Sequence, residues 1–199
     1  MKYFKKIEGT RVYLSPISLD DAETFCKWLN DRSVTDGINK TKNLVTVEDE
    51  KNWIESIRNT NDYNFSIINK NNNELIGNCT IRKIDYISGH AELGILIGEE
   101  ENRNKGYGKE VISLLLNYGF NELNLHSIEL SALSFNKRAI NCYKKVGFKE
   151  VGKIRESIYN NGKLHDVIIL DILKEEFNNL KFKNKQNVWI TQTFLFFLI

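Results

Sequence analysis

The order of apolar and polar residues divides the chain into segments with two different periods. Segments whose apolar residues alternate with polar ones or run together, as in strands, are residues 11–14, 63–68, 75–84, 90–98, 126–133, 148–154 and 164–173. Segments whose apolar residues recur at helical spacing are residues 18–31, 46–57, 109–123 and 136–147. Residues 32–45 have no period, so we expect a loop there. About seven strands and about four helices in this order predict an α/β protein built on a mixed sheet.

One strand is followed directly by a glycine-bearing loop and a helix. The apolar run from Ala91 to Gly98 leads into residues 103–108, RNKGYG, and then into the helix. The first N–H groups of a helix lack intrahelical partners and carry partial positive charge, so an anion such as phosphate binds well there. Gly106 and Gly108 have no Cβ, which lets an anion approach the backbone. Taken alone, an ordinary tight turn before a surface helix explains this stretch equally well.

The spacing of these glycines differs from that of two better-known phosphate loops. The dinucleotide fingerprint needs three glycines spaced G-x-G-x-x-G, and only Gly106 and Gly108 fit that spacing. The P-loop pattern G-x-x-x-x-G-K-[ST] is absent. The motif that remains is R-x-x-G-x-G after an apolar strand.

Composition limits the class of protein. A chain of 199 residues with 41% hydrophobic content suits one domain with a buried core. The net charge of +2 predicts neither nucleic acid nor a membrane surface as a partner. Cys26, Cys79 and Cys142 show no paired spacing and no metal-ligand spacing with histidine, so we expect no metal. The N-terminus lacks the apolar core of a signal peptide, and we expect a reducing, cytoplasmic location.

A second motif follows the predicted strand 126–133. It is the segment 136–148, NKRAINCYKKVGF, in which Gly147 has the position of a left-handed helix C-cap. Asn136 and Tyr143 are seven residues apart, so both lie on one face of the helix. Taken alone, Asn136 is explained by helix capping and Tyr143 by core packing. The two motifs in this order, with a strand between them, favour a shared function.

Together these motifs resemble those of the GCN5-related N-acetyltransferases, the GNAT superfamily, over about residues 10–176. Residues 25–31 and 159–167 are similar to its RimJ/RimL-type branch, which includes ribosomal-protein N-terminal and spermidine acetyltransferases. The resemblance implies a GNAT fold, with a sheet splayed open between the strands 92–98 and 126–133 and acetyl-CoA in the gap. The implied cofactor-binding residues are Ile95, Leu96 and Ile97 for the pantetheine arm, the backbone of Arg103, Asn104, Lys105, Gly106, Tyr107 and Gly108 for the diphosphate, and Asn136 for the pantetheine amide.

The resemblance also implies direct transfer of acetyl from the thioester to an amine. Tyr143, with an ordinary pKa of about 10, is protonated at neutral pH and would donate to the leaving thiolate, as the matching tyrosine does in the family. Glu92 matches the spacing of the general base in the histone-acetylating branch and would need a pKa raised by burial. Two alternatives stay open, a salt-linked Glu92 and loss of the amine proton to a water chain. The base position of another branch is Ser131 here.

The leading hypothesis is therefore an N-acetyltransferase that moves acetyl from acetyl-CoA to a primary amine. The acceptor is a protein N-terminal α-amine, a polyamine or another small amine, and an α-amine, with a pKa of about 8, needs the least help from a base. Two hypotheses from other classes are a non-catalytic acetyl-CoA-binding sensor or scaffold and a nucleotide-binding module.

The end of the chain lies outside the resemblance. We expect an acetyltransferase domain over residues 1–177 and an extension over residues 178–199 that is basic and then strongly apolar. The apolar part is shorter than the roughly 20 residues that span a bilayer, so we expect no membrane segment. We expect it to pack on its own domain or at a homodimer contact.

Overall fold

The computed structural model describes residues 2–38 and 44–180, which form one mixed sheet with helices on both faces. The strands are β1 (Ile7–Glu8), β2 (Val12–Pro16), β3 (Tyr63–Asn69), β4 (Leu75–Asp85), β5 (His90–Ile97), β6 (Ser127–Leu133), β7 (Lys149–Asn160) and β8 (Lys163–Leu173). Their order across the sheet is β1-β2-β3-β4-β5-β6-β8-β7. The α-helices are α1 (Ala22–Leu29), α2 (Arg32–Thr35), α3 (Val47–Ile57), α4 (Tyr107–Asn121) and α5 (Lys137–Val146). Three short 3-10 helices are η1 (Leu19–Asp21), η2 (Asp36–Ile38) and η3 (Glu100–Asn102).

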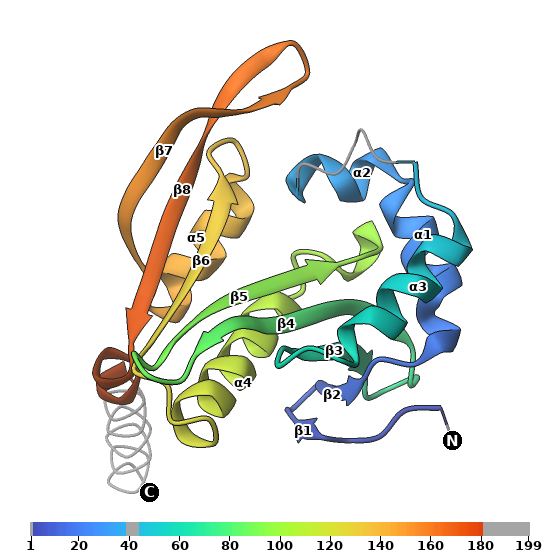
Figure 1. Ribbon diagram of the computed structural model, residues 1–199, viewed down its shortest axis with the longest axis horizontal. Coiled ribbons are helices and arrows are strands. Elements are labelled where there is room, and N and C mark those ends of the chain that lie inside the picture. The colour runs from blue at the N-terminus through green and yellow to red at the C-terminus, as the bar shows by residue number, and fades with distance from the viewer. Residues whose placement is uncertain (1, 39–43, 181–199) are drawn as a thin grey trace, which may run out of the picture.

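The sheet splits in two between β5 and β6. These parallel strands pair only at His90–Ser127, Ala91–Ile128 and Glu92–Glu129. Every other neighbouring pair is antiparallel. Beyond Glu92 the two strands diverge, and the molecule takes the V shape seen in Figure 1, with β1 to β5 in one arm and β6 to β8 in the other.

Helices cover both faces of the larger arm. On one face α4 buries an apolar stripe at 3.6-residue spacing, formed by Val111, Ile112, Leu115, Leu116 and Phe120. On the other face α1 and α3 bury Phe25, Trp28 and Ile54, and Leu75 and Leu96 of the sheet pack against them. Burying each such side chain contributes about 1.5–3 kcal/mol. The two layers therefore hold β4 and β5 firmly between them.

Local sequence signals set the ends of several elements, and the predicted left-handed C-cap at Gly147 is confirmed. Thr46 caps α3 in a reciprocal capping box with Asp49. Gly147 ends α5 in the left-handed region with φ of +118°. The turn between β7 and β8 is Asn161–Gly162, and both residues have positive φ, as a two-residue hairpin requires.

One expectation about an element is wrong, and one short strand adds to the predicted set. Residues 32–38, expected in a loop, form α2 and η2, and the Asp31 carboxylate accepts a bond from the Ser33 N–H at 2.8 Å. The sheet has eight strands rather than about seven, because β1 pairs with β2 through Ile7 and Glu8. Both elements are too short to produce a period in the sequence.

The described chain ends in helical turns from residue 174 to Leu180. Phe177 is buried there, and its ring centroid lies 5.6 Å from that of Phe120. The helix crosses the predicted boundary at residue 177, and the apolar segment 189–199 lies outside the described residues. Among the described residues, none of the helices has the length and apolar character needed to cross a membrane.

Candidate active site

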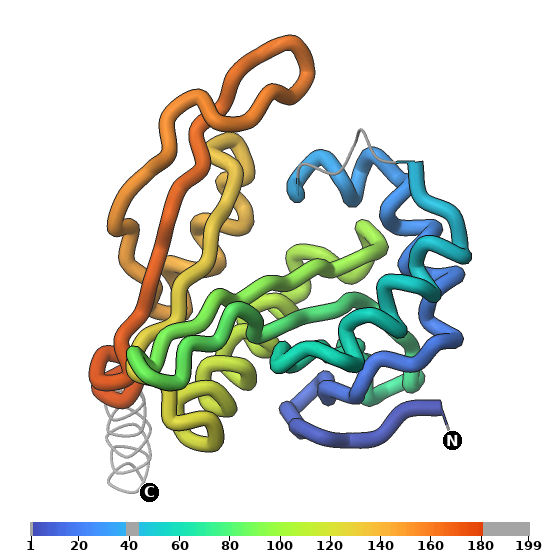
Figure 2. The backbone as a smooth tube through the Cα atoms, in the orientation of Figure 1, coloured from blue at the N-terminus to red at the C-terminus, as the bar shows by residue number. Residues whose placement is uncertain are grey.

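A cleft of about 1070 Å³ lies between the two arms of the sheet. Its lining comes from β4, β5, the loop before α4, β6, α5 and the segment around α2. Figure 2 shows the arms diverging along β5 and β6 from the end where these strands meet, with the β7–β8 turn bending toward α2. The break in the ladder thus brings both sequence motifs to one cavity.

The edge of β5 forms one wall of this cleft. Gly94, Ile95, Leu96 and Ile97 line it and have no ladder partner on β6. Gly98 follows them, and a Cβ there would lie 2.1 Å from the Trp28 ring, so only glycine lets α1 pack on this end of β5. A strand edge open to a cleft offers N–H and C=O groups to an extended ligand.

The loop before α4 presents main-chain donors to the same cleft. Among the described residues, the N–H groups of Asn104 to Gly108 have no backbone carbonyl partner. Asn104 and Gly106 have φ of +59° and +85°, a backbone form that makes anion-binding concavities. The amide of Arg103 differs, because it already donates to the Glu100 carbonyl at 2.9 Å. The run of free backbone N–H groups therefore begins at Asn104, one residue after the predicted start at Arg103.

The Arg103 side chain holds the loop instead. Its guanidinium donates to the Gly98 carbonyl at 2.5 Å and to the Ser33 carbonyl at 2.9 Å. Burial lowers the pKa of Arg103, but arginine stays charged at any physiological pH. Arg103 thus fastens the loop to the end of β5 and to α2.

Asn136 sits on the opposite side of the cleft at the start of α5. Its side-chain oxygen accepts from the Ala139 N–H at 3.1 Å, which caps the helix. Its side-chain nitrogen donates to the Gly37 carbonyl at 3.2 Å. Both ends of the amide are therefore engaged inside the protein, and a ligand would compete with Gly37 for the nitrogen.

Tyr143 lies about two turns further along the same face of α5, and it also lines the cleft. Its ring is 9% exposed and packs beside Phe148, with centroids 6.1 Å apart. Burial raises the pKa of Tyr143 to about 12, and the neighbouring Cys142 thiol acts in the same direction. The hydroxyl therefore holds its proton throughout the neutral range.

Glu92 lines the cleft as well, and two cations contact its carboxylate. Arg82 Nη2 lies 2.6 Å from Glu92 Oε1, and Lys83 Nζ lies 2.7 Å from Oε2. Burial by itself raises the pKa of Glu92, but these two cations outweigh it and lower the pKa below its ordinary value. The raised pKa that a general base at this position would need is therefore absent, and the salt-linked alternative describes the geometry.

The strap, residues 32–38 of α2 and η2, crosses between the arms. Arg32 Nη2 donates to Asn161 Oδ1 at 3.0 Å, and Asn160 Nδ2 donates to Asp36 Oδ1 at 3.3 Å. Together with the bond from Asn136 to Gly37, these contacts tie the strap to the β7–β8 arm. The cleft is consequently bridged at its upper end.

Comparison with known proteins places this geometry in a family. Residues 11–149 match the model of the acetyltransferase (GNAT) domain. The chain is 32% identical over 174 residues to p20, an N-acetyltransferase of Bacillus licheniformis named as uncharacterized, a match covering 84% of this chain and 95% of p20. This chain belongs to the GNAT acetyltransferases. Its predicted fold and enzyme class are thereby confirmed.

Two further relatives of this GNAT protein carry a named substrate. The spermidine N(1)-acetyltransferase of Vibrio cholerae serotype O1 is 36% identical over 105 residues, which cover 53% of this chain and 60% of that protein. The crystal structure of spermidine N-acetyltransferase from Vibrio cholerae in complex with CoA and spermine matches with a TM-score of 0.76 and 25% identity. That match covers 84% of this chain and 98% of the other.

The GNAT cleft also contains residues that the sequence reading missed. Glu50 and Trp53 of α3 line it, and Glu50 is 7% exposed. Glu50 is one of three acidic residues in the first turn of its helix, where helix-dipole stabilisation explains a carboxylate without any site. Across the described residues, no three His, Cys, Asp or Glu side chains are grouped as a metal site.

Proposed function

We propose that this GNAT protein transfers acetyl from acetyl-CoA to the primary amine of a small cationic acceptor. The observation that carries the proposal is the meeting of three features in one cleft. These are the open edge of β5, the uncommitted amides of residues 104–108 and the protonated hydroxyl of Tyr143. Each suits a different part of a thioester donor.

The donor would bind along the β5 edge and on the loop. In this arrangement the pantetheine arm pairs with the backbone of residues 95–97, like an added strand. The diphosphate lies on the amides of residues 104–108 at the N-terminus of α4. The relative from Vibrio cholerae that was crystallised with CoA supports this choice of donor.

The reaction would be a direct displacement at the acetyl carbonyl. The amine nitrogen attacks the carbonyl carbon, a C–N bond forms, and collapse of the tetrahedral species breaks the C–S bond. The Tyr143 O–H donates its proton to the departing sulfur, so the thiol leaves neutral, and the Tyr143 oxygen regains a proton that the new amide nitrogen releases through water. The raised pKa of Tyr143 keeps that proton in place until the thiolate forms.

The proton of the incoming ammonium would leave through water rather than directly to Glu92. A carboxylate whose pKa lies below its ordinary value is a weak base toward an amine with a pKa near 10. Glu92 stays ionised and offsets the charges of Arg82 and Lys83, which would otherwise repel a cationic acceptor from the β5 edge. This assignment keeps Glu92 in the site and changes its role.

A slender acceptor suits the bridged cleft better than a folded protein terminus. The strap closes the upper end through Arg32, Asp36 and the β7–β8 turn. Below it the lining combines the aromatic side chains of Phe25 and Trp53 with the carboxylate of Glu50. Such walls accept an aliphatic cation, and the spermidine acetyltransferases among the relatives have such a substrate.

An amine panel with acetyl-CoA tests the proposal. The panel contains spermidine, spermine, an aminoglycoside and a peptide with a free N-terminus, and turnover is followed as free thiol and as product mass. We expect thiol release with the polyamines and a product heavier by one acetyl group. Thermal stabilisation by acetyl-CoA without thiol release for any amine would instead identify a sensor or scaffold. Stabilisation by ATP or NAD but not by CoA would identify a nucleotide-binding module.

A further inference from the structure

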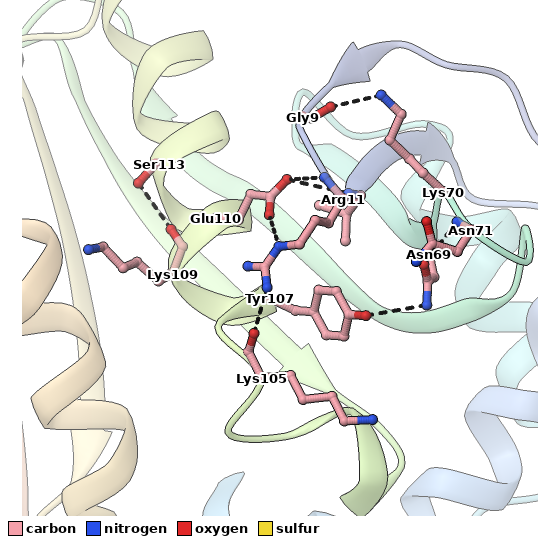
Figure 3. A network of polar contacts seen from close by, with 11 residues as sticks. Gly9, Arg11, Asn69, Lys70, Asn71, Lys105, Tyr107, Lys109, Glu110 and Ser113 are labelled. Atoms are coloured by element: carbon pink, nitrogen blue, oxygen red, sulfur yellow. Dashed lines mark hydrogen bonds and ion pairs between the residues drawn. The ribbon is translucent and has the colours of Figure 1, made fainter. Parts of the chain in front are cut away.

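Arg11 contacts the loop that presents the free amides, on the side of the loop away from the cleft. Figure 3 shows the contacts, which join the start of β2 to the start of α4. Arg11 Nη1 donates to the Lys105 carbonyl at 2.7 Å, and Arg11 Nε donates to Glu110 Oε2 at 3.0 Å. The guanidinium carbon also lies 5.1 Å from the centre of the Tyr107 ring. One side chain thus contacts the residues on both sides of Gly106.

Glu110 fixes Arg11 in turn. Glu110 Oε1 accepts from the Arg11 N–H at 2.7 Å and from the Val12 N–H at 3.3 Å. Burial raises the pKa of Glu110, but its bonds from Arg11 and Val12 prevail and lower the pKa overall. The carboxylate is therefore ionised at neutral pH and anchors both the backbone and the guanidinium of Arg11.

The bond to Lys105 sets the direction of an amide on the other side of the loop. In a trans peptide the carbonyl of one residue and the N–H of the next point in opposite directions, and no described peptide is cis. The Lys105 carbonyl points to Arg11, so the Gly106 N–H points away from it. Gly106 lines the cleft, whereas Arg11, Lys105 and Glu110 do not. Arg11 therefore acts on the cleft through the backbone.

We propose that Arg11, anchored by Glu110, is a positioning residue for the diphosphate part of acetyl-CoA. It holds the peptide between Lys105 and Gly106 so that the amide faces the bound anion. This inference rests on the proposed function, because it assigns the diphosphate to these amides. Only arginine serves here, since its planar fork reaches the Lys105 carbonyl and Glu110 at once.

The test compares two acetyl donors in the Arg11→Ala variant of the full chain. Acetyl-CoA carries the diphosphate, and S-acetylpantetheine carries only the arm and the thioester. We expect KM for acetyl-CoA to rise about tenfold, the size of one hydrogen bond made by a charged group, with kcat nearly unchanged. The kcat/KM for S-acetylpantetheine should stay within about twofold of wild type. Arg58→Ala, which removes an exposed arginine at the end of α3, is the matched control and should change neither donor.

A conservative variant separates positioning from charge. Arg11→Lys keeps the positive charge but has no fork, so we expect its KM for acetyl-CoA to stay close to that of Arg11→Ala. Full rescue by lysine would show that charge alone matters, and an equal loss with both donors would show a general structural role. Either result overturns the inference.

The affinity of CoA itself, measured by calorimetry, distinguishes this inference from the proposed function. Wild type that binds no CoA refutes the proposed function. Wild type that binds CoA, with an Arg11→Ala variant that binds it equally well, refutes only the role of Arg11.

Discussion

At the scale of single residues, burial and ion pairing shift the pKa values of two cleft side chains in opposite directions. Tyr143 is enclosed by apolar neighbours, and its pKa rises to about 12. Glu92 is also largely buried, yet Arg82 and Lys83 lie within 2.7 Å of its oxygens and lower its pKa. At neutral pH the hydroxyl of Tyr143 therefore keeps its proton, and the carboxylate of Glu92 is ionised and paired with two cations.

Tyr143→Phe tests the donor role. Removing the hydroxyl leaves the ring packing beside Phe148 and removes the proton for the leaving sulfur. We expect kcat to fall about 100-fold, the usual scale of general-acid catalysis, with the Kd of acetyl-CoA unchanged. Steady-state kinetics and calorimetry measure the two quantities. An unchanged kcat would remove Tyr143 from the chemistry.

Glu92→Gln tests whether that carboxylate takes the proton. If water takes the proton, the acidic limb in the pH profile of kcat/KM follows the pKa of the acceptor amine. The variant then leaves the position of that limb unchanged. The variant leaves Arg82 and Lys83 uncompensated, so KM for a polyamine should rise several-fold, because repulsion between charges near a surface is about 1 kcal/mol. If the acidic limb disappears from the pH profile of the variant, Glu92 is the general base.

At the scale of elements, the loop before α4 and the strap define the two ends of the site. The loop depends on a left-handed residue at Gly106, where φ is +85° and a Cβ would lie 3.1 Å from Arg11 Nη2. The strap depends on side-chain hydrogen bonds to the β7–β8 turn. In the proposed function, the first feature binds the donor, and the second limits the size of the acceptor.

Gly106→Val tests the loop. A β-branched residue with this φ is strained by about 1–3 kcal/mol, so the loop changes shape and its amides turn away from the cleft. We expect CoA affinity to fall tenfold or more by calorimetry. Gly162→Val is the matched control, because Gly162 has φ of +79° in an open turn with no atom within 4 Å of a Cβ. Retained affinity in Gly106→Val would contradict the diphosphate assignment.

The double variant Asn160→Ala/Asn161→Ala tests the strap. Both substitutions remove the partners of Asp36 and Arg32, so the upper end of the cleft opens. We expect kcat/KM for the peptide acceptor to rise several-fold relative to that for spermidine. Lys163→Ala in the same turn leaves both bonds intact and serves as the control. An unchanged ratio would show that the strap does not select by size.

At the scale of the whole molecule, the two arms meet through three backbone pairs of β5 and β6 and through a shared core. That core joins Leu115 and Leu116 of the larger arm to Ile128, Leu130 and residues of β8. Backbone pairs and core packing therefore join the arms at the base of the V, and side-chain hydrogen bonds join them at its top.

Alkaline pH should weaken the folded state. Burial raises the pKa of both Tyr3 and Tyr143 to about 12, against about 10 in the unfolded chain. Between these values the unfolded chain binds fewer protons than the folded one, so the free energy of unfolding falls as pH rises from 10 to 12. Urea unfolding at pH 9, 10 and 11 measures the slope. The double variant Tyr3→Phe/Tyr143→Phe should flatten it, and an identical slope in wild type and variant would contradict this origin.

The sequence by itself determined the elements whose signals are local. Thr46, Gly147 and the Asn161–Gly162 turn encode their geometry through neighbouring residues, and the stripe from Val111 to Phe120 encodes which face of α4 is buried. The motif around Gly106 likewise identified the family, because its spacing needs no distant partner. Such signals depend on the period and on the conformational preferences of single residues.

Only the tertiary structure decided how distant groups affect one another. The pKa of Glu92 depends on Arg82 and Lys83 of the neighbouring strand, and the Asn136 amide is engaged by Gly37, which lies 99 residues away. Arg11 and Glu110 are likewise 99 residues apart in sequence and form one ion pair. Electrostatic and hydrogen-bond energies depend on separation in space, and the order of residues along the chain does not contain that separation.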